Sequence, residues 1–418
     1  MKSLGHYIYN LGLSLGHIYI ELFRVFVPKL SLLHRGRQQT WQKLEKLDTK
    51  NKKTFWIHCA SLGEFEQGRM LIEKVYIHHP DVYIILSFFS SSGYEIAKNY
   101  DKVDEIIYLP TDFVSNARQL IQKIKPDIVV FVKYEFWWNL IQEIQEQKIP
   151  LYLIAGVFRN ENYFFRFPFS HFAKYLSKYD MLYIQNESSA SVLADHDITN
   201  YHIVGDPRID RVVNRSYSTI INDDIYEYCK DKTVIIYGSV WPEDMAILSD
   251  FINEQTDFVH IIAPHNIGED HIRKITKSIK RSFDCYSDDE LLHDILVIDN
   301  IGMLGGLYKT AKYAYVGGGF GVSIHNILEP AVFGIPVLFG PNHTKFKEAY
   351  DLIAIGAGFS INTCQELMAV INNYEQDNQK VKHTKQALKE FFVKNEGATE
   401  AIYNDIILSS AFNTKKNI

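Results

Sequence analysis

The sequence predicts an α/β protein with two doubly wound sheets, one in each half of the chain. Strand-like and helix-like runs alternate along most of the 418 residues, which is typical of this fold class. Several strand-like runs are continuously apolar, as expected for parallel strands that helices cover on both faces. The alternation is interrupted once, by a polar and charged segment at residues 210–232 that reads as a linker with one helix. The pattern therefore predicts two Rossmann-like domains, with a boundary near residues 206–230.

The expected elements fall into two sets. In the first half we expect strands at residues 54–60, 82–89, 105–109, 127–132, 150–154, 181–184 and 201–204. In the second half we expect strands at residues 233–237, 258–263, 295–298, 313–316 and 336–339. We divide the chain into an amphipathic helix at residues 1–40, a Rossmann-like domain at 41–210, a second at 211–395, and a C-terminal helix and tail at 396–418.

The first segment is an apolar helix followed by basic residues. Five apolar side chains recur at steps of three and four and so share one helical face: Leu11, Leu15, Ile18, Leu22 and Val25. Pro28 ends this helix, and a basic group follows: Lys29, His34, Arg35 and Arg37. An apolar helix beside basic residues suits an anionic membrane surface. A helix packed on its own domain fits the pattern equally well, and a single membrane span is a third interpretation.

Composition argues against several classes of protein. The formal net charge of −6 argues against a general affinity for nucleic acid. Hydrophobic residues make up 46% of the chain and charged residues 22%, an ordinary balance for a globular protein. The four cysteines are scattered, so neither a disulfide framework nor a zinc site is indicated.

The most informative segment follows the expected strand at residues 313–316. Gly317, Gly318 and Gly319 come directly after that strand. A polar cluster comes next, at the start of a helix that contains Pro330: His325, Asn326 and Glu329. Glycines let the backbone approach a ligand and offer N–H groups to an anion, and a glutamate can bind ribose hydroxyls. This pattern is typical of a sugar-nucleotide site, although a turn in any α/β domain also explains the glycines alone.

In the first half, Glu64 lies at the opening of a helix that follows the strand at residues 54–60. Ser61 is a suitable N-cap residue, and a helix N-terminus stabilises a charged carboxylate, the form that a general base requires. Alternatively, Glu64 completes a capping box with Ser61, since the Ser-x-x-Glu spacing fits that motif.

Three further candidates in the first half lie among aromatic residues. Glu135 follows the strand at residues 127–132, where aromatic walls suit a sugar; an ion pair with Lys133 or an arginine is the alternative. Arg159 and Arg166 are interspersed with aromatic residues and can bind the phosphates of a lipid. The alternative is a helix that packs its aromatic side chains inward.

Other candidates in the second half also follow expected strands. Gly238 and Ser239 can offer N–H groups to a phosphate, and Pro264 and His265 can stack on a base. Lys345 follows the strand at residues 336–339 and can contact a carboxylate or phosphate. Each of these is individually compatible with an ordinary turn. Their common position matters more, because ligands of doubly wound folds bind at the carboxyl ends of the strands.

Five segments, in order, resemble the signatures of one family. They are His58 to Glu64, Pro126 to Trp137, Asp299 to Gly302, Gly317 to Pro330 and Pro336 to Phe346. The family is the Kdo transferases (3-deoxy-D-manno-octulosonic acid transferases, glycosyltransferase family 30) of lipopolysaccharide and lipid A synthesis. The resemblance extends over about residues 5 to 400.

The resemblance implies a B-type glycosyltransferase fold, with two Rossmann-like domains facing a central cleft. It implies a CMP-Kdo donor bound by the second domain, a lipid A precursor as acceptor at the first, and an inverting reaction without metal or cofactor. It places the enzyme at the cytoplasmic face of the inner membrane. By position, Glu64 is the expected general base, and Glu135 lies near the acceptor or the reacting centre, together with Arg159 and Arg166. The expected donor residues are Arg208, Gly238, Ser239, Pro264, His265, Gly317, Gly318, Gly319, His325, Asn326, Glu329 and Lys345.

Several positions depart from the family pattern. Met303 stands where the family usually has glutamate. Lys133 stands where the family has the first of two glutamates after the strand at residues 127–132, so only the second, Glu135, carries over. Trp138 replaces a frequent proline, Arg208 stands in for another basic residue, and Arg159 is a shifted substitute for the family's arginine. Two other interpretations stay open: another two-Rossmann enzyme, such as a UDP-sugar transferase or epimerase, and a non-catalytic membrane-bound scaffold.

Overall fold

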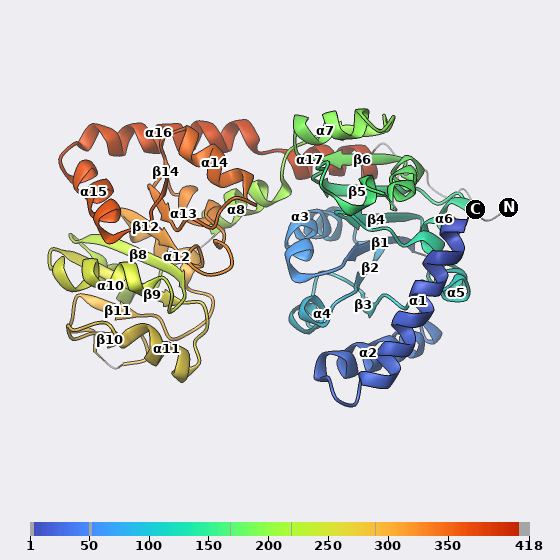
Figure 1. The fold of residues 1–418 in the computed structure, drawn as a ribbon, viewed down its shortest axis with the longest axis horizontal. Coiled ribbons are helices and arrows are strands. Elements are labelled where there is room, and N and C mark those ends of the chain that lie inside the picture. The colour runs from blue at the N-terminus through green and yellow to red at the C-terminus, as the bar shows by residue number, and fades with distance from the viewer. Residues whose placement is uncertain (1–3, 50–51, 168, 219, 289, 409–418) are drawn as a thin grey trace. The chain divides into compact units, whose positions relative to one another are not determined.

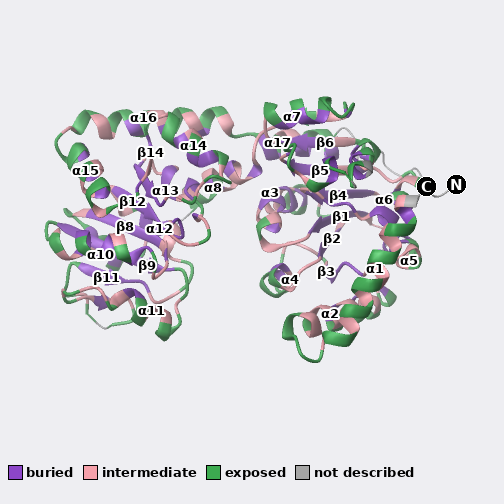
Figure 2. Cartoon of the chain, in the orientation of Figure 1, coloured by how far each residue is buried: buried purple, intermediate pink, exposed green. Residues whose placement is uncertain are grey.

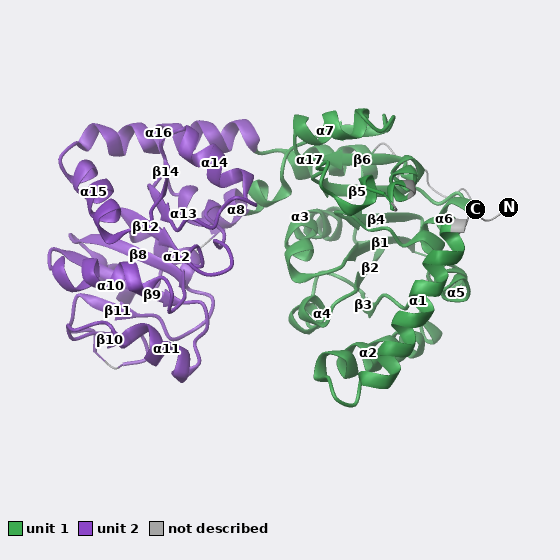
Figure 3. Cartoon of the chain, in the orientation of Figure 1, with its two compact units in different colours: residues 1–211, 396–418 green, residues 212–395 purple. Residues whose placement is uncertain are grey.

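The protein folds into two compact units (Figures 1 and 3). The structure is a computed structural model, and it describes residues 4–49, 52–167, 169–218, 220–288 and 290–408. Unit 1 comprises Met1–Arg211 together with Glu396–Ile418, and unit 2 comprises Val212–Asn395. The chain therefore leaves unit 1, forms unit 2 and returns to unit 1 at its C-terminal end.

Unit 1 is built on a seven-stranded sheet with the order β3-β2-β1-β4-β5-β6-β7. Its strands are β1 Lys53–Cys59, β2 Val82–Phe88, β3 Glu105–Tyr108, β4 Ile128–Val132, β5 Leu151–Gly156, β6 Met181–Ile184 and β7 Tyr201–Ile203. Its helices are α1 Leu4–Phe23, α2 Pro28–Glu45, α3 Leu62–His78, α4 Ser91–Ala97, α5 Val114–Ile124, α6 Trp138–Glu146, α7 Glu187–Ala194, α17 Ala398–Tyr403, the 3-10 helices η1 Tyr163–Phe165 and η2 Ser170–Lys178, and the π-helix η4 Asn404–Leu408. Helix α8, Pro207–Ser218, contains the boundary between the units.

Unit 2 is built on a second seven-stranded sheet with the order β10-β11-β9-β8-β12-β13-β14. Its strands are β8 Thr233–Val240, β9 Phe258–Pro264, β10 Asp284–Cys285, β11 Ile295–Val297, β12 Tyr313–Val316, β13 Val337–Phe339 and β14 Gly358–Ser360. Its helices are α9 Asp223–Cys229, α10 Met245–Glu254, α11 Glu269–Thr276, α12 Leu304–Leu307, η3 Tyr308–Thr310, α13 Leu328–Ala331, α14 Lys347–Ala354, α15 Cys364–Glu375 and α16 Asn378–Asn395.

Both sheets are parallel at every pair of neighbouring strands, so the carboxyl ends of the strands share one edge of each sheet. The central strands are buried on both faces, as Figure 2 shows. In β1, Trp56 packs into one core cluster while its neighbours Phe55 and Ile57 pack into the other, on the opposite face. The strands are therefore continuously apolar because helices cover the side chains on both faces of the sheet.

The expected strands are confirmed at every predicted position, with bounds that differ by a few residues at most. Two strands, β10 and β14, have no predicted counterpart, because neither Asp284–Cys285 nor Gly358–Ser360 is an apolar run. The segment at residues 210–232 holds two helices, α8 and α9, where one helix within a linker is expected, so that prediction is wrong.

The N-terminal segment forms two helices rather than one. Pro28 occupies the first turn of α2, where its missing N–H costs nothing, and α1 and α2 meet at a bend of 112°. In the described part of the chain, no single helix combines the length and apolarity needed to cross a bilayer. Only α1 and α2 taken as one bent pair reach that length and composition.

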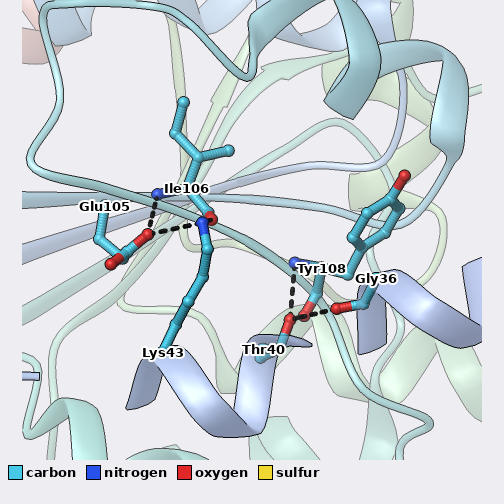
Figure 4. Close-up of polar contacts among 6 residues, drawn as sticks. All are labelled: Gly36, Thr40, Lys43, Glu105, Ile106 and Tyr108. Atoms are coloured by element: carbon cyan, nitrogen blue, oxygen red, sulfur yellow. Dashed lines mark hydrogen bonds and ion pairs between the residues drawn. The ribbon is translucent and has the colours of Figure 1, made fainter. Parts of the chain in front are cut away.

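Two polar side chains dock α2 on the edge strand β3 (Figure 4). The Thr40 hydroxyl accepts from the Tyr108 N–H at 3.0 Å and lies 3.0 Å from the Tyr108 carbonyl oxygen and 3.1 Å from that of Gly36. Lys43 donates to the Ile106 carbonyl and to Glu105. These side chains satisfy polar backbone groups that an uncovered edge strand would expose.

The apolar face of α1 is exposed. Of the five residues that predicted this face, four lie in α1 and Val25 follows its end; all are between 52% and 82% exposed: Leu11, Leu15, Ile18, Leu22 and Val25. The interpretation of a helix packed on its own domain holds for α1, but not through this face. A different side of α1 attaches to unit 1, where the Tyr9 hydroxyl donates to Asp112 at 2.7 Å. Among the basic residues that follow, Arg37 turns inward and donates to the Leu109 carbonyl and the Thr111 hydroxyl.

Candidate functional site

The first candidate cluster lies at the carboxyl ends of β1 and β4 in unit 1. Glu135 follows β4 and is 6% exposed, and its Oε2 lies 3.3 Å from Nε2 of His58 in β1. The contact lacks hydrogen-bond geometry. It exists because β1 and β4 are paired in the sheet, with His58 opposite Phe131. The carboxylate of Glu135 is thus placed beside an imidazole.

A buried chain of hydrogen bonds orients His58. Its Nδ1 lies 2.8 Å from the Ser87 hydroxyl, which accepts from the Trp56 indole N–H, also at 2.8 Å. Because Ser87 accepts from Trp56, its own hydrogen is available for Nδ1 of His58. This arrangement favours the tautomer with its proton on Nε2, the nitrogen that faces Glu135.

Glu64 takes the capping role that its sequence allowed, and its role as a general base stays a prediction. Its Oε2 accepts from the Ser61 N–H at 3.1 Å, which completes a capping box at the start of α3. Burial raises the pKa of its carboxyl, and the negative charge of Glu135 raises it further, while Lys133 and His58 oppose the shift. Glu64 is therefore a helix-capping carboxylate that lies within electrostatic reach of Glu135.

A strained turn positions Glu135. Lys133, directly after β4, has a φ of 63°, a left-handed conformation that is costly for a residue with a side chain. Its N–H still donates to the Ile154 carbonyl in the neighbouring β5, at 2.9 Å. The turn therefore reverses the chain at the end of the sheet without losing this bond. Strained backbone of this kind is concentrated at functional sites.

The two arginines differ in their environment. Arg159 lies close enough to Tyr134 to affect the pKa of its hydroxyl. Burial raises that pKa, the positive charge of Arg159 lowers it, and the negative charge of Glu64 raises it. Arg159 is thus an exposed residue within electrostatic reach of the carboxylate cluster. Arg166 is exposed too, and its Nε donates to the Asn160 carbonyl at 3.3 Å. Their roles toward a lipid phosphate stay predictions.

In unit 2, Asp244 occupies the glycine-rich turn after β12. This fully buried carboxylate accepts from the Gly318 N–H at 2.9 Å, from the Trp241 N–H at 2.8 Å and from the Tyr315 hydroxyl at 2.7 Å. The Gly317 N–H donates to the Gly238 carbonyl. The expectation that these glycines offer free N–H groups to an anion is therefore wrong for Gly317 and Gly318, because the chain's own acceptors take them.

Glycine is nevertheless required in this turn for steric reasons. Gly318 has a φ of 91°, which favours glycine. A Cβ on Gly319 would lie 2.6 Å from the backbone of Gly340, in the loop that follows β13. The turn after β12 and the loop after β13 therefore touch backbone to backbone, and Lys345 lies exposed further along that loop.

A stack of three rings lies beside this turn. His265 stacks on Trp241 and on His325, with ring centroids 4.5 Å and 4.4 Å apart. The Trp241 indole donates to Nε2 of His325 at 2.9 Å. Burial lowers the pKa of His325 to about 4, so this ring is a neutral acceptor at physiological pH. Two predicted donor residues, from the ends of β9 and of the glycine turn, are thus in direct contact.

Glu329 lies near the end of β8. Asn326 donates to Oε1 of Glu329 at 3.2 Å, and its own side-chain oxygen accepts from the N–H of Leu328 at the start of α13. Burial raises the pKa of the Tyr308 hydroxyl well above its usual value, and the charge of Glu329 adds to this. The same hydroxyl lies where a Cβ of Gly238 would be. Glu329 and Gly238 therefore both lie close to the Tyr308 hydroxyl.

Three other predicted donor residues have defined places. Ser239 is the bulged residue of β8, with a φ of 55°, and Pro264 is the buried last residue of β9. Arg208 belongs to unit 1, in the first turn of α8, where its guanidinium donates twice to Asp206. The structure therefore groups most of the predicted donor residues in unit 2 and places Arg208 in the other unit.

Sequence reasoning did not select three residues of these clusters: His58, Asp244 and Trp241. His58 and Trp241 each lie at the end of a strand, within segments already singled out, so position alone could have found them. Asp244 follows β8 by four residues, and its contact with the turn after β12 depends on tertiary structure. Among the described residues, no three His, Cys, Asp or Glu side chains form a group that could hold a metal ion.

Residues 35–211 match a family model described as 3-deoxy-D-manno-octulosonic-acid transferase (Kdo transferase). The chain is 26% identical over 410 residues to a bifunctional glycosyltransferase/methyltransferase of Fusobacterium nucleatum, covering 93% of this chain and 61% of that protein. It therefore spans less than two thirds of that relative. It is 24% identical to a 3-deoxy-D-manno-octulosonic acid transferase of Rickettsia bellii, over 77% of this chain and 79% of that one.

Solved structures share the fold. The UDP-GlcNAc 2-epimerase of Neisseria meningitidis, solved with UDP-GlcNAc bound, superposes with a TM-score of 0.63 over 86% of this chain and all of that chain. At 14% identity this likeness concerns the fold alone. The predicted fold class, an α/β chain of two Rossmann-like domains, is confirmed. The resemblance to the Kdo transferases is confirmed as well.

Proposed function

We propose, from its resemblance to the Kdo transferases, that this chain is a glycosyltransferase that moves Kdo from CMP-Kdo to a lipid A precursor. The observation that carries the proposal is the cluster of Glu64, Glu135 and His58 at the strand ends of unit 1, within the segment that matches the family model. A carboxylate with a raised pKa, next to a second carboxylate, suits a general base that must accept a proton from a sugar hydroxyl.

In the proposed reaction the acceptor hydroxyl attacks the anomeric carbon of Kdo as its proton passes to Glu64. The new carbon–oxygen bond forms opposite the bond to the phosphate, which breaks with both electrons going to CMP, so the configuration inverts. CMP departs as a stable phosphate anion, and the mechanism therefore needs neither a general acid nor a metal. Glu135 and His58 orient the acceptor, and the charge of Glu135 adds to the raised pKa that burial gives Glu64.

Unit 2 is the proposed donor-binding unit. Glu329, held by Asn326, binds the ribose hydroxyls, and the rings of His265 and Trp241 provide a surface for the base. The backbone at Gly238 and Ser239 faces the phosphate. Because Asp244 already fills the glycine turn, we assign the phosphate to the end of β8 rather than to the amides of Gly317 and Gly318.

Replacing Glu64 by glutamine tests the base. Glutamine can still accept from the Ser61 N–H, so the capping box and the melting temperature should be retained. We expect kcat for Kdo transfer to fall by about 10²- to 10⁴-fold, the usual contribution of a general base. Product formation is measured by mass spectrometry, with Glu66→Gln, a carboxylate two residues further along the same helix, as the matched control. Near-wild-type turnover in Glu64→Gln would remove Glu64 from the role of base.

A nucleotide panel separates the proposal from its alternatives. CMP should raise the melting temperature of the protein and UDP should not, since only a bound nucleotide stabilises the native state. Stabilisation by UDP instead would favour a UDP-sugar transferase or epimerase. No stabilisation by either nucleotide, with no loss of function on changing Glu64, would favour a non-catalytic scaffold.

The exposed apolar face of α1 supports a location at the cytoplasmic face of the inner membrane, where a lipid acceptor resides. We propose that α1 lies in the membrane surface. Arg35 is exposed nearby and adds attraction to anionic lipids, whereas Arg37 is committed to the protein interior.

A further inference from the structure

A groove of 580 Å³ runs along the inner side of α1 in unit 1. Its volume lies within the range of about 300–1,000 Å³ that is usual for small-molecule sites. One wall is formed by α1 from Gly5 to Ile20, a length of about 22 Å at 1.5 Å per residue. The other wall is aromatic, with Phe89, Trp137 and Phe172. An elongated, mainly apolar space of this kind fits an extended acyl chain.

Glycines on α1 keep this space open. Gly12 and Gly16 line the groove, and a Cβ placed on either of them would meet no atom within 4 Å. Glycine inside a helix costs about 1 kcal/mol relative to alanine, and here no close approach within the chain requires it. This differs from Gly36 on α2, where a Cβ would overlap the Tyr108 ring. The two glycines of α1 therefore preserve empty volume rather than a packing contact.

Two charged side chains that line the groove, Asp112 and Arg37, already have partners within the chain. Asp112 accepts from Tyr9 and from the N–H groups of Asn139 and Leu140. Arg37 donates to Leu109 and Thr111, and its guanidinium lies 5.3 Å from the centre of the Phe89 ring. A ligand in the groove is therefore not needed to neutralise Asp112 or Arg37. The Trp137 indole nitrogen is buried without a hydrogen-bond partner, and the rest of the lining offers a ligand mainly apolar surface.

The aromatic wall connects the groove to the carboxylate cluster. The centre of the Trp137 ring lies 5.0 Å from that of Phe89 and 6.0 Å from that of His58, and His58 also contacts Glu135. One side of Trp137 thus belongs to the groove, and the ring also contacts the proposed acceptor site. A lipid whose sugar lies at Glu135 can pass an acyl chain around Trp137 into the groove.

We propose that this groove binds one acyl chain of the lipid acceptor, withdrawn from the bilayer while the sugar reacts. The proposal rests on the proposed function for the identity of the lipid. The exposed apolar face of the same helix, from Leu11 to Leu22, argues for a lipid rather than a protein occupant, because it brings a bilayer to the helix that lines the groove. Burial of the chain transfers part of the acceptor's binding energy to a site remote from the reacting hydroxyl.

Filling the groove tests the proposal. Gly12→Leu and Gly16→Leu add a side chain in open space, and both raise the helix propensity of α1, so folding should be retained. Ser14→Leu adds the same side chain to the same helix at a position outside the groove lining, where only an intrahelical bond to the Asn10 carbonyl is lost. Brominated myristate is the probe, and quenching of tryptophan fluorescence reports its binding near Trp137.

We expect saturable quenching in the wild type and in Ser14→Leu, and at least about tenfold weaker binding in both glycine variants. Trp137→Phe should remove most of the quenching without abolishing binding measured by equilibrium dialysis. Equal binding in all variants would overturn the proposal, as would an absence of saturable binding in the wild type. A change of oligomeric state confined to the glycine variants would point to a second copy of the chain as the occupant and would also overturn it.

Kinetics separate this inference from the function on which it rests. In the wild type, the KM for the acylated precursor should be lower than the KM for its deacylated disaccharide. Gly12→Leu and Gly16→Leu should raise the KM for the acylated precursor and leave the KM for the deacylated disaccharide unchanged. Equal effects on both acceptors, or none, would overturn the groove assignment while the transferase function stands. Transfer to neither acceptor, with groove-specific binding of myristate, would overturn the function instead.

Discussion

At the scale of single residues, burial raises the pKa of Glu64, and the charge of the neighbouring Glu135 raises it further. Glu64 and Glu135 come from different strand ends, and each lies in surroundings with little water to screen charge. Their effect reaches the thiol of Cys59, whose pKa is raised by burial and by both carboxylates. A base with a raised pKa remains protonated to higher pH, so its activity is lost on the acid side of the pH profile.

Removing the charge of Glu135 should therefore move that acid limb. In Glu135→Gln the pKa of Glu64 falls, because the like charge that raised it is gone, and the acid limb of kcat/KM should shift to lower pH. The measurement is the pH dependence of kcat/KM for Kdo transfer in the wild type and the variant. Glu66→Gln is the control, since Glu66 is paired with Arg69 and Arg211. An acid limb that stays in place, or moves to higher pH, would refute the electrostatic coupling.

The residues that sequence reasoning found and missed differ in one physical respect. Glu64 was recognisable because its capping partner Ser61 is only three residues away and because the strand before it, β1, is largely apolar. Asp244 was not, because its partners Tyr315 and Gly318 are more than 70 residues away. The glycines after β12 predicted an anion-binding turn. In the structure the carboxylate of Asp244, from the chain itself, accepts from the Gly318 N–H in that turn. Local patterns indicated that negative charge belongs there and could not indicate its source.

At the scale of elements, the strands were predictable and the docking of α2 was not. Runs such as residues 128–132 are apolar throughout, so they could be assigned without knowledge of their neighbours. Helix α2 buries Leu44 in the core, and it is also held to the edge strand by Thr40 and Lys43, two polar residues that no hydrophobic period identifies. Its attachment depends on which strand lies at the edge of the sheet, and that order follows from topology rather than from local sequence.

Removal of the Thr40 hydroxyl should loosen this attachment. Thr40→Val keeps the shape of the side chain but leaves the Tyr108 N–H without its acceptor, at a cost of about 1–3 kcal/mol in the free energy of unfolding of unit 1. The amide of Tyr108 should exchange faster with solvent, as measured by hydrogen exchange. Thr40→Ser retains the hydroxyl and should preserve the protection of that amide. Unchanged exchange in Thr40→Val would mean that the β3 edge is held by other contacts.

At the scale of the whole molecule, unit 1 is completed by a segment that follows unit 2 in the chain. Helix α17 and η4 contribute four buried side chains to the core on the α3 face of the sheet: Ile402, Tyr403, Ile406 and Ile407. Asp210, in α8, accepts from the N–H groups of Gly397 and Thr399 and so anchors the returning segment. The sequence-based division treated residues 396–418 as an appended helix and tail, since nothing local indicates which sheet a helix of this length will join.

Deleting residues 396–418 should therefore unfold unit 1 selectively. Burial of each large apolar side chain is worth about 1.5–3 kcal/mol, so the loss of four approaches the total stability of a domain. Hydrogen exchange of the truncated protein should show rapid exchange in β1 to β7 and retained protection in β8 to β14, whose core does not include this segment. Two single substitutions serve as a milder test and its control. Ile407→Ala removes a buried side chain and should lower the free energy of unfolding of unit 1 by about 2–5 kcal/mol, whereas Leu408→Ala removes an exposed side chain and should lower it much less. Equal loss of protection in both sheets would mean that the two units do not unfold independently.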